Sequence, residues 1–258
     1  MRKILKNKPL IEAIFEMRWE LEEEKESKFK LDPHYKLLIG RLYDKLNNQY
    51  PYHEQLPSTN IPDIMANYIV QNRFRKAENE WPLIQLGPGI MTVNDTEGYI
   101  WEDFQKRITQ AIDYLYDVYP NSNEDLILNK IMLRYIDAVN FDFENLDIFS
   151  FLKENMNFNL EFNQKLFEDN VAIEPKPSNI NLTFNFKSLE PKGIVYLRFA
   201  SGKVKESNAL IWETVVQSFS EDAPKIHKDI FNWINNAHNL TDNWFFKLIE
   251  GNLLKRFE

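Results

Sequence analysis

The sequence predicts an α+β protein in which helices pack on a curved antiparallel sheet. Several segments alternate apolar and polar side chains with the period of two that is typical of half-buried strands, and others show helical spacing. The order strand, helix, several strands, long helix occurs twice, which indicates two similar halves, residues 1–122 and 123–258. We therefore predict a duplicated helix-grip or TATA-binding-protein-like layout, and one continuous sheet because no flexible linker separates the halves.

The first strand is expected in the segment PLIEAIFEMRWE, residues 9–20. Apolar side chains occupy every second position there, and charged residues fall between them, so one face should be buried. The charged segment ELEEEKESK then forms a solvated connection. Asp32 followed by Pro33 predicts the start of a helix, which should end near Asn47 because its apolar stripe stops there.

The remainder of the first half should contain a loop, two strands and a helix. Prolines recur within residues 50–63, and proline lacks the backbone donor that strands and helix interiors need, so we expect an ordered loop. Residues 67–74 and 81–95 are interpreted as an antiparallel pair, with turns or a bulge at Trp81-Pro82 and at residues 87–89. Helical spacing of apolar residues follows from Trp101 to Pro120.

The second half repeats this order, with a strand at residues 126–143 and a short helix at 145–156. Further strands are expected near residues 161–167, 179–186, 193–200 and 209–219. After Pro224, two apolar stripes predict two terminal helices, and Thr241 is interpreted as the N-cap of the second one.

Composition argues against several kinds of partner. The chain has 31 basic and 39 acidic residues, and the resulting formal charge of −8 disfavours non-specific binding to nucleic acid or anionic lipid. Cysteine is absent, which excludes disulfides, thiolate metal ligands and a cysteine nucleophile. The amino-terminal apolar run is interrupted by acidic residues, so we predict neither a signal peptide nor a membrane span, and a cytoplasmic protein.

The search for catalytic motifs gives no candidate. Only seven glycines occur, and the nearest approach to a phosphate-binding loop, GPGIMTVNDTEG, is better interpreted as a bulged turn. No G-x-S-x-G motif is present, and the four histidines do not have zinc-ligand spacing. Glu102 and Asp103 are explained by the positive end of a helix dipole. We therefore predict no catalytic residues, no metal, no cofactor and no enzymatic activity.

The segment NKIMLRYIDAVNFD, residues 129–142, contains the first candidate binding residues. Neighbouring residues of a strand point to opposite faces, so Tyr135 and Asp137 can share a face that Arg134 cannot. In one interpretation Tyr135 joins the core, Asp137 ends the buried stretch, and Arg134 pairs with a carboxylate across the sheet, for example Glu12. In the other, Arg134 lies in an open groove and binds a carboxylate or phosphate of a ligand or partner.

Three more candidate residues lie near the carboxyl terminus. His238 is expected close to a helix end, where it could cap the helix or orient an anionic ligand together with Arg134 or Tyr135. Trp244, Phe245 and Phe246 are consecutive, and successive helix residues differ by about 100° in direction, so they cannot all point inward. Trp244 and Phe246 therefore predict either a contact with a protein partner or second copy, or packing against the other half.

Four segments, KPLIEAIFEMRW, IQLGPGIMTVND, IMLRYIDAV and AHNLTDNWFFKLI, resemble a family of uncharacterised prokaryotic proteins that is sporadically distributed across bacteria. The resemblance covers nearly the whole chain. It implies the domain span and an association with mobile or defence islands, and no particular chemistry.

Together these observations predict a non-enzymatic cytoplasmic binding or adaptor protein, with a protein partner encoded nearby in a phage-defence or toxin-antitoxin operon. The alternative is a module that binds a small anionic or nucleotide ligand between the curved sheet and the long helix.

Overall fold

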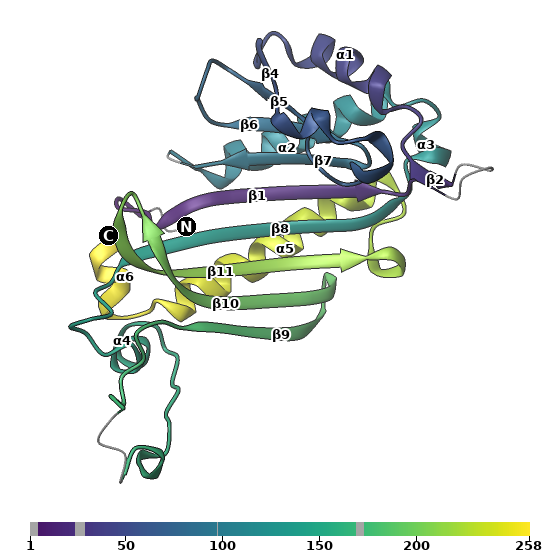
Figure 1. Cartoon of the computed structure of the whole chain (residues 1–258). Coiled ribbons are helices and arrows are strands. Elements are labelled where there is room, and N and C mark those ends of the chain that lie inside the picture. The colour runs from purple at the N-terminus through teal and green to yellow at the C-terminus, as the bar shows by residue number, and fades with distance from the viewer. Residues whose placement is uncertain (1–4, 24–28, 97, 169–172) are drawn as a thin grey trace.

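The computed structural model describes residues 5–23, 29–96, 98–168 and 173–258. These residues form an α+β fold with a large antiparallel sheet, which confirms the predicted class (Figure 1). Its strands, in spatial order, are β4 (Tyr52–Gln55), β5 (Asn72–Arg75), β6 (Leu83–Gly87), β7 (Ile90–Asp95), β1 (Leu10–Trp19), β8 (Leu128–Asn140), β11 (Ser207–Phe219), β10 (Lys192–Val204) and β9 (Asn181–Leu189). The helices are α1 (Tyr35–Leu46), α2 (Trp101–Val118), α3 (Ser122–Asp125), α4 (Ile148–Asn155), α5 (His227–Leu248) and α6 (Asn252–Phe257), and a small separate pair joins β2 (Glu22–Glu23) to β3 (Lys30–Leu31).

The antiparallel strands β1 and β8 join the two parts of this sheet. Strands from residues 1–122 lie on the β1 side and strands from residues 123–258 lie on the β8 side. The register pairs Phe15 with Leu133 and Ala13 with Tyr135, and the first three of these side chains are buried. Apolar side chains thus face each other across the junction, which stabilises the pairing.

Helices cover one face of the sheet. Side chains of α1, α2 and α5 pack with alternate residues of β1, β8 and their neighbours in one buried cluster, which we call the main core. Figure 1 shows α5 crossing behind the central strands. Phe15 and Trp19 of β1 are completely buried in the main core, as the alternation of the first strand predicts. Each such side chain contributes about 2 kcal/mol by leaving water.

A second buried cluster, the end core, lies where β8, β10 and β11 meet α4 and α6. Phe199, Trp212 and Leu253 are completely buried in it. Trp244 of α5 packs against both clusters. The long helix α5 therefore connects the two cores along one face of the sheet.

The opposite face of the sheet is polar and held by ion pairs. Glu16 of β1 accepts from Arg18 of the same strand and from Lys130 of β8, each at 2.8 Å. Gln85 donates to Asn94, whose own amide donates to Glu12 at 2.7 Å. Antiparallel sheets commonly bury one face and leave the other to water, and the charged residues between the apolar positions of each strand form this second face.

The helix predicted to start at Asp32 begins at Tyr35, with His34 as its N-cap, and Asp32 stabilises the turn before it. The Asp32 carboxylate accepts from the backbone N–H of His34 and from Trp19 Nε1, both at 3.0 Å, just before α1 begins. It also accepts from the backbone N–H of Gly89, which has a φ of +73° in the turn between β6 and β7. Glycine adopts this backbone conformation without strain, so the predicted turn at residues 87–89 forms where expected.

Three predicted boundaries are wrong. Residues 52–55, predicted as loop, form β4, because Pro51 and Pro57 flank this edge strand and do not interrupt it. Residues 161–167, predicted as a strand, contain only the 3₁₀ turn Gln164–Leu166 within the described chain. The strand expected at 67–74 begins at Asn72.

The terminal region also differs from the prediction, because α5 is one continuous helix of 22 residues. Thr241 lies inside it and is buried, and its hydroxyl donates back to the carbonyl oxygens of Ala237 and His238. Threonine can satisfy its hydroxyl in this way within a helix, so it does not have to start one. No helix among the described residues is long and apolar enough to cross a membrane.

Candidate functional site

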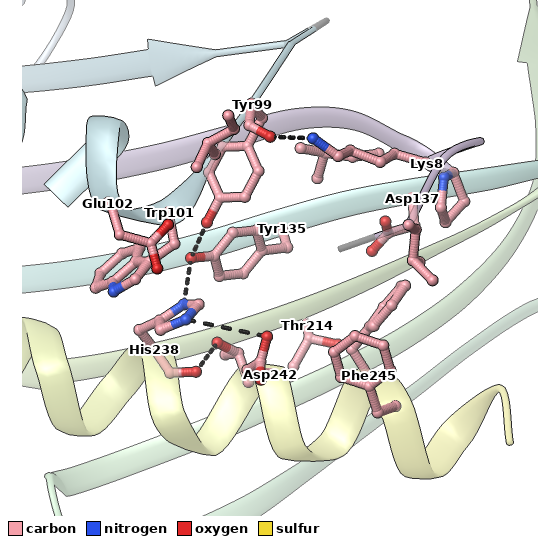
Figure 2. A pocket seen from close by; sticks show the side chains of 16 residues that line it. Lys8, Tyr99, Trp101, Glu102, Tyr135, Asp137, Thr214, His238, Asp242 and Phe245 are labelled. Atoms are coloured by element: carbon pink, nitrogen blue, oxygen red, sulfur yellow. Dashed lines mark hydrogen bonds and ion pairs between the residues drawn. The ribbon is translucent and has the colours of Figure 1, made fainter. Parts of the chain in front are cut away.

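A pocket of about 110 Å³ lies between α5, the start of α2 and the strands β8 and β11 (Figure 2). The segment before β1 lies along its rim. Its walls are mainly apolar and aromatic, with a few polar groups, which is the usual composition of a ligand site. The lining residues are Leu5, Lys8, Pro9, Leu10, Tyr99, Ile100, Trp101, Glu102, Tyr135, Asp137, Thr214, His238, Thr241, Asp242, Phe245 and Phe246.

Strand β8 places Tyr135 and Asp137 in the pocket wall. They are two residues apart and therefore share the face that α5 covers, as the strand geometry predicts. Beside Asp137, the register with β1 shifts between Leu10, which pairs with Asp137, and Glu12, which pairs with Ile136. The extra residue there forms a β-bulge, a feature that often redirects side chains near functional sites.

Asp137 is the most unusual residue of the pocket. Its side chain projects from β8 into the pocket (Figure 2), and the residue is only 3% exposed. Within the described chain its carboxyl has neither a hydrogen bond nor an ion pair, and burial raises its pKa to about 8. Removal from water disfavours the charged form, so Asp137 is mostly protonated and neutral at pH 7.

A hydrogen-bonded chain of two tyrosines and a histidine forms another wall. The hydroxyls of Tyr99 and Tyr135 are 3.0 Å apart, and the Tyr135 hydroxyl is 2.9 Å from His238 Nδ1. The His238 ring stacks on Trp101 with centroids 3.7 Å apart and planes 10° from parallel. Its Nε2 lies 4.0 Å from the carboxylate of Asp242. These contacts fix the imidazole on the pocket wall.

The predicted helix-capping role of His238 is wrong. His238 lies in the middle of α5, is 5% exposed, and bonds to a strand rather than to helix carbonyls at an end. The prediction failed because it placed a helix boundary between His238 and Thr241, where the helix continues.

Arg134 lies on the other face of the sheet, away from the pocket. Its guanidinium contacts Glu213 of β11 at 2.7 Å, and Glu213 also contacts Arg198 of β10 at 3.0 Å. The structure thus gives Arg134 a carboxylate across the sheet, as one of the two interpretations predicts. The partner is Glu213 and not Glu12, because β8 has a neighbour on each side and Glu12 instead accepts from Asn94.

Trp244 and Phe246 both have contacts within the chain. Trp244 packs edge-to-face against Phe186 of β9, with centroids 5.3 Å apart, and Phe246 lines the pocket beside Phe245. All three consecutive aromatic residues of α5 are partly buried. Their different directions are accommodated by the sheet on one side and the pocket on another.

Sequence reasoning missed most of the pocket, including Lys8, Trp101 and Asp242. One signal was present: Asp137 has the same parity as the buried residues Leu133 and Val139, so it interrupts a buried row. Among the described residues no group of three or more histidines and acids could hold a metal ion.

Comparison of the chain with models of protein families finds no match, and comparison with curated proteins finds none either.

Proposed function

We propose that this protein binds a small molecule in the pocket between α5 and the sheet. The observation that carries the proposal is the buried, unpartnered carboxyl of Asp137 facing an open and mainly apolar pocket. A buried polar group without a partner costs stability, on the order of 1–3 kcal/mol. A ligand that pairs with this carboxyl would recover that free energy and would explain why the residue is there.

The volume of the pocket sets the size of the ligand. About 110 Å³ is somewhat smaller than the roughly 150 Å³ cavity that holds a benzene molecule in a protein interior. The bound group is therefore a single ring or a branched alkyl group of similar size. Larger parts of a ligand would extend past the rim, where Ile100 is 40% exposed.

We also propose that the chain is a duplication, with the pocket at the junction of its halves. The strand order supports this: β1 and β8 are central, and β7, β6 and β5 leave β1 in the order in which β11, β10 and β9 leave β8. In chain order, α1 and α4 come after the first strand of their halves, β1 and β8, and α2 and α5 come after the last, β7 and β11. Both halves contribute lining residues, and ligand sites favour such junctions.

The adaptor role, the protein partner and the link to a defence operon remain predictions. Trp244 and Phe246, the residues expected to contact a partner, do not favour them, because both pack within the chain.

Benzyl alcohol, a neutral single-ring probe, tests the pocket in the full-length protein. At a concentration ten times its dissociation constant, it should raise the melting temperature by about 3 °C, because ligand binding stabilises the folded state by mass action. Thr214→Phe fills the pocket from β11 and should abolish the shift, whereas Thr214→Val keeps the shape of the side chain and should retain it. Ile100→Trp blocks the exposed rim and serves as a second blocking variant. Equal shifts in wild-type and blocked variants, or none in the wild type, would refute the proposal.

A further inference from the structure

The charges around the pocket identify the kind of ligand more closely. The titratable groups that face Asp137 are Lys8 before β1, Tyr99 and Glu102 at the start of α2, Tyr135 on β8, and His238 and Asp242 on α5. Three of the lining residues thus carry carboxyl groups, and one is a lysine.

The basic groups of the pocket are directed away from Asp137. The Lys8 ammonium donates to the backbone carbonyl of Tyr99. His238 uses Nδ1 for Tyr135 and approaches Asp242 with Nε2. Neither forms an ion pair with Asp137, so the only buried carboxyl of the lining faces the pocket without a countercharge from the described residues.

Aromatic rings complete the walls. Trp101, Phe245 and Phe246 line the same space as Asp137, together with the two tyrosines. The faces of aromatic rings attract cations, and sites for organic ammonium ions are commonly lined by such rings. The same rings also bury the apolar part of a ligand.

We propose that the ligand is a small organic amine in its protonated form, whose ammonium group pairs with the Asp137 carboxylate while its ring or alkyl group fills the aromatic part of the pocket. This inference rests on the proposed binding function. A carboxylate ligand, which the sequence suggested, would instead approach Glu102 and Asp242, and it could accept a hydrogen bond from Asp137 only while that carboxyl is protonated.

Binding of an amine should release a proton. The free protein holds a proton on the Asp137 carboxyl at pH 7, and an ammonium ion brings its own positive charge, so the carboxyl proton leaves to solvent as the ion pair forms. Because the pKa of Asp137 is about 8, only about one tenth of the free protein has this carboxyl ionised at pH 7. The amine affinity at pH 7 is therefore about tenfold lower than for a fully ionised carboxyl. A charge-assisted hydrogen bond in a site of low dielectric exceeds this cost.

Isothermal titration calorimetry of the full-length protein tests the inference with benzylamine, benzyl alcohol and benzoate as probes at pH 6, 7 and 8. Benzylamine affinity should rise about tenfold from pH 6 to 7 and about fivefold from pH 7 to 8, as Asp137 ionises. Titrations in two buffers of different ionisation enthalpy should show release of about 0.9 proton at pH 7 for benzylamine and none for benzyl alcohol. Asp137→Asn should remove the pH dependence and lower benzylamine affinity at pH 8 at least tenfold, while the exposed control Asp44→Asn changes neither.

The possible results separate the inference from the function on which it rests. Suppose that benzyl alcohol binds and Thr214→Phe blocks it, but benzylamine binds no tighter at pH 8 or releases no proton. The proposal of an amine ligand is then wrong, and the proposal of a binding pocket is retained. Tightest binding of benzoate would overturn the amine in favour of an anionic ligand. If none of the three probes binds the wild-type protein, both proposals fail.

Discussion

Replacing Asp137 by asparagine should change how the stability of the protein depends on pH. Burial raises the pKa of this carboxyl from 3.8 to about 8 in the folded protein. Between these values the folded chain keeps a proton that the unfolded chain has lost, so raising the pH favours unfolding. The stabilising contribution is complete below pH 4 and is lost as the pH rises to 8.

The size of the effect follows from the pKa. Each pH unit inside this window lowers the free energy of unfolding by about 1.4 kcal/mol, or about 4 kcal/mol between pH 5 and pH 8. Asparagine keeps the shape of the side chain and has no proton to lose. The stability of Asp137→Asn relative to the wild type should therefore increase by about 4 kcal/mol over that range.

Urea denaturation at pH 5, 6, 7 and 8, followed by tryptophan fluorescence, measures this difference. Other titrating groups are common to both proteins and cancel in the comparison, and Asp44→Asn on the exposed side of α1 controls for the loss of a carboxylate. If the difference in stability between Asp137→Asn and wild type is the same at pH 5 and pH 8, Asp137 is not held protonated and burial does not raise its pKa.

Three further substitutions test other parts of the structure in the same urea assay. Glu213→Gln should cost about 2 kcal/mol and more than Arg134→Gln, because Glu213 holds two arginines on the polar face; an equal cost would contradict this role. Tyr135→Phe should cost about 1 kcal/mol and shift the NMR signals of the His238 ring, since it removes the hydroxyl bonded to Nδ1; unchanged histidine signals would exclude that bond. Phe15→Ala should cost about 4 kcal/mol, as expected for a completely buried ring, and a cost below 1 kcal/mol would place Phe15 outside the core.

The fold class and most strands could be predicted because the sheet buries one face. A period of two then appears in the sequence wherever a strand is long, as in β1 and β8. The short edge strand β4 has no such pattern, since only four residues pair and none of them is buried. The continuity of α5 could not be predicted either. Its asparagines and threonine are residues that often cap helix ends, and only packing against the sheet keeps the helix continuous through them.

The candidate site was predicted only in part. Strand parity correctly separated Arg134 from Tyr135 and Asp137, because alternation is a local property of one strand. The burial of Asp137 depends on α5 and on the segment before β1, which are distant in sequence and close over the strand. A local pattern cannot show such closure, so Asp137 was interpreted as the end of a buried stretch.

The pocket arises where the buried rows of three neighbouring elements each carry polar side chains. Along β8 the row runs from Leu133 through Tyr135 and Asp137 to Val139, and along β11 Thr214, which pairs with Tyr135, stands between Trp212 and Val216. On α5, His238 and Thr241 interrupt the apolar stripe that continues on either side. One polar residue in a core can be stabilised by a nearby hydrogen bond. Here three elements carry polar residues in their buried rows, and each of them loses apolar burial. Proteins retain such a loss of apolar burial mainly at functional positions. The coincidence on three elements therefore supports a binding pocket independently of the pKa of Asp137.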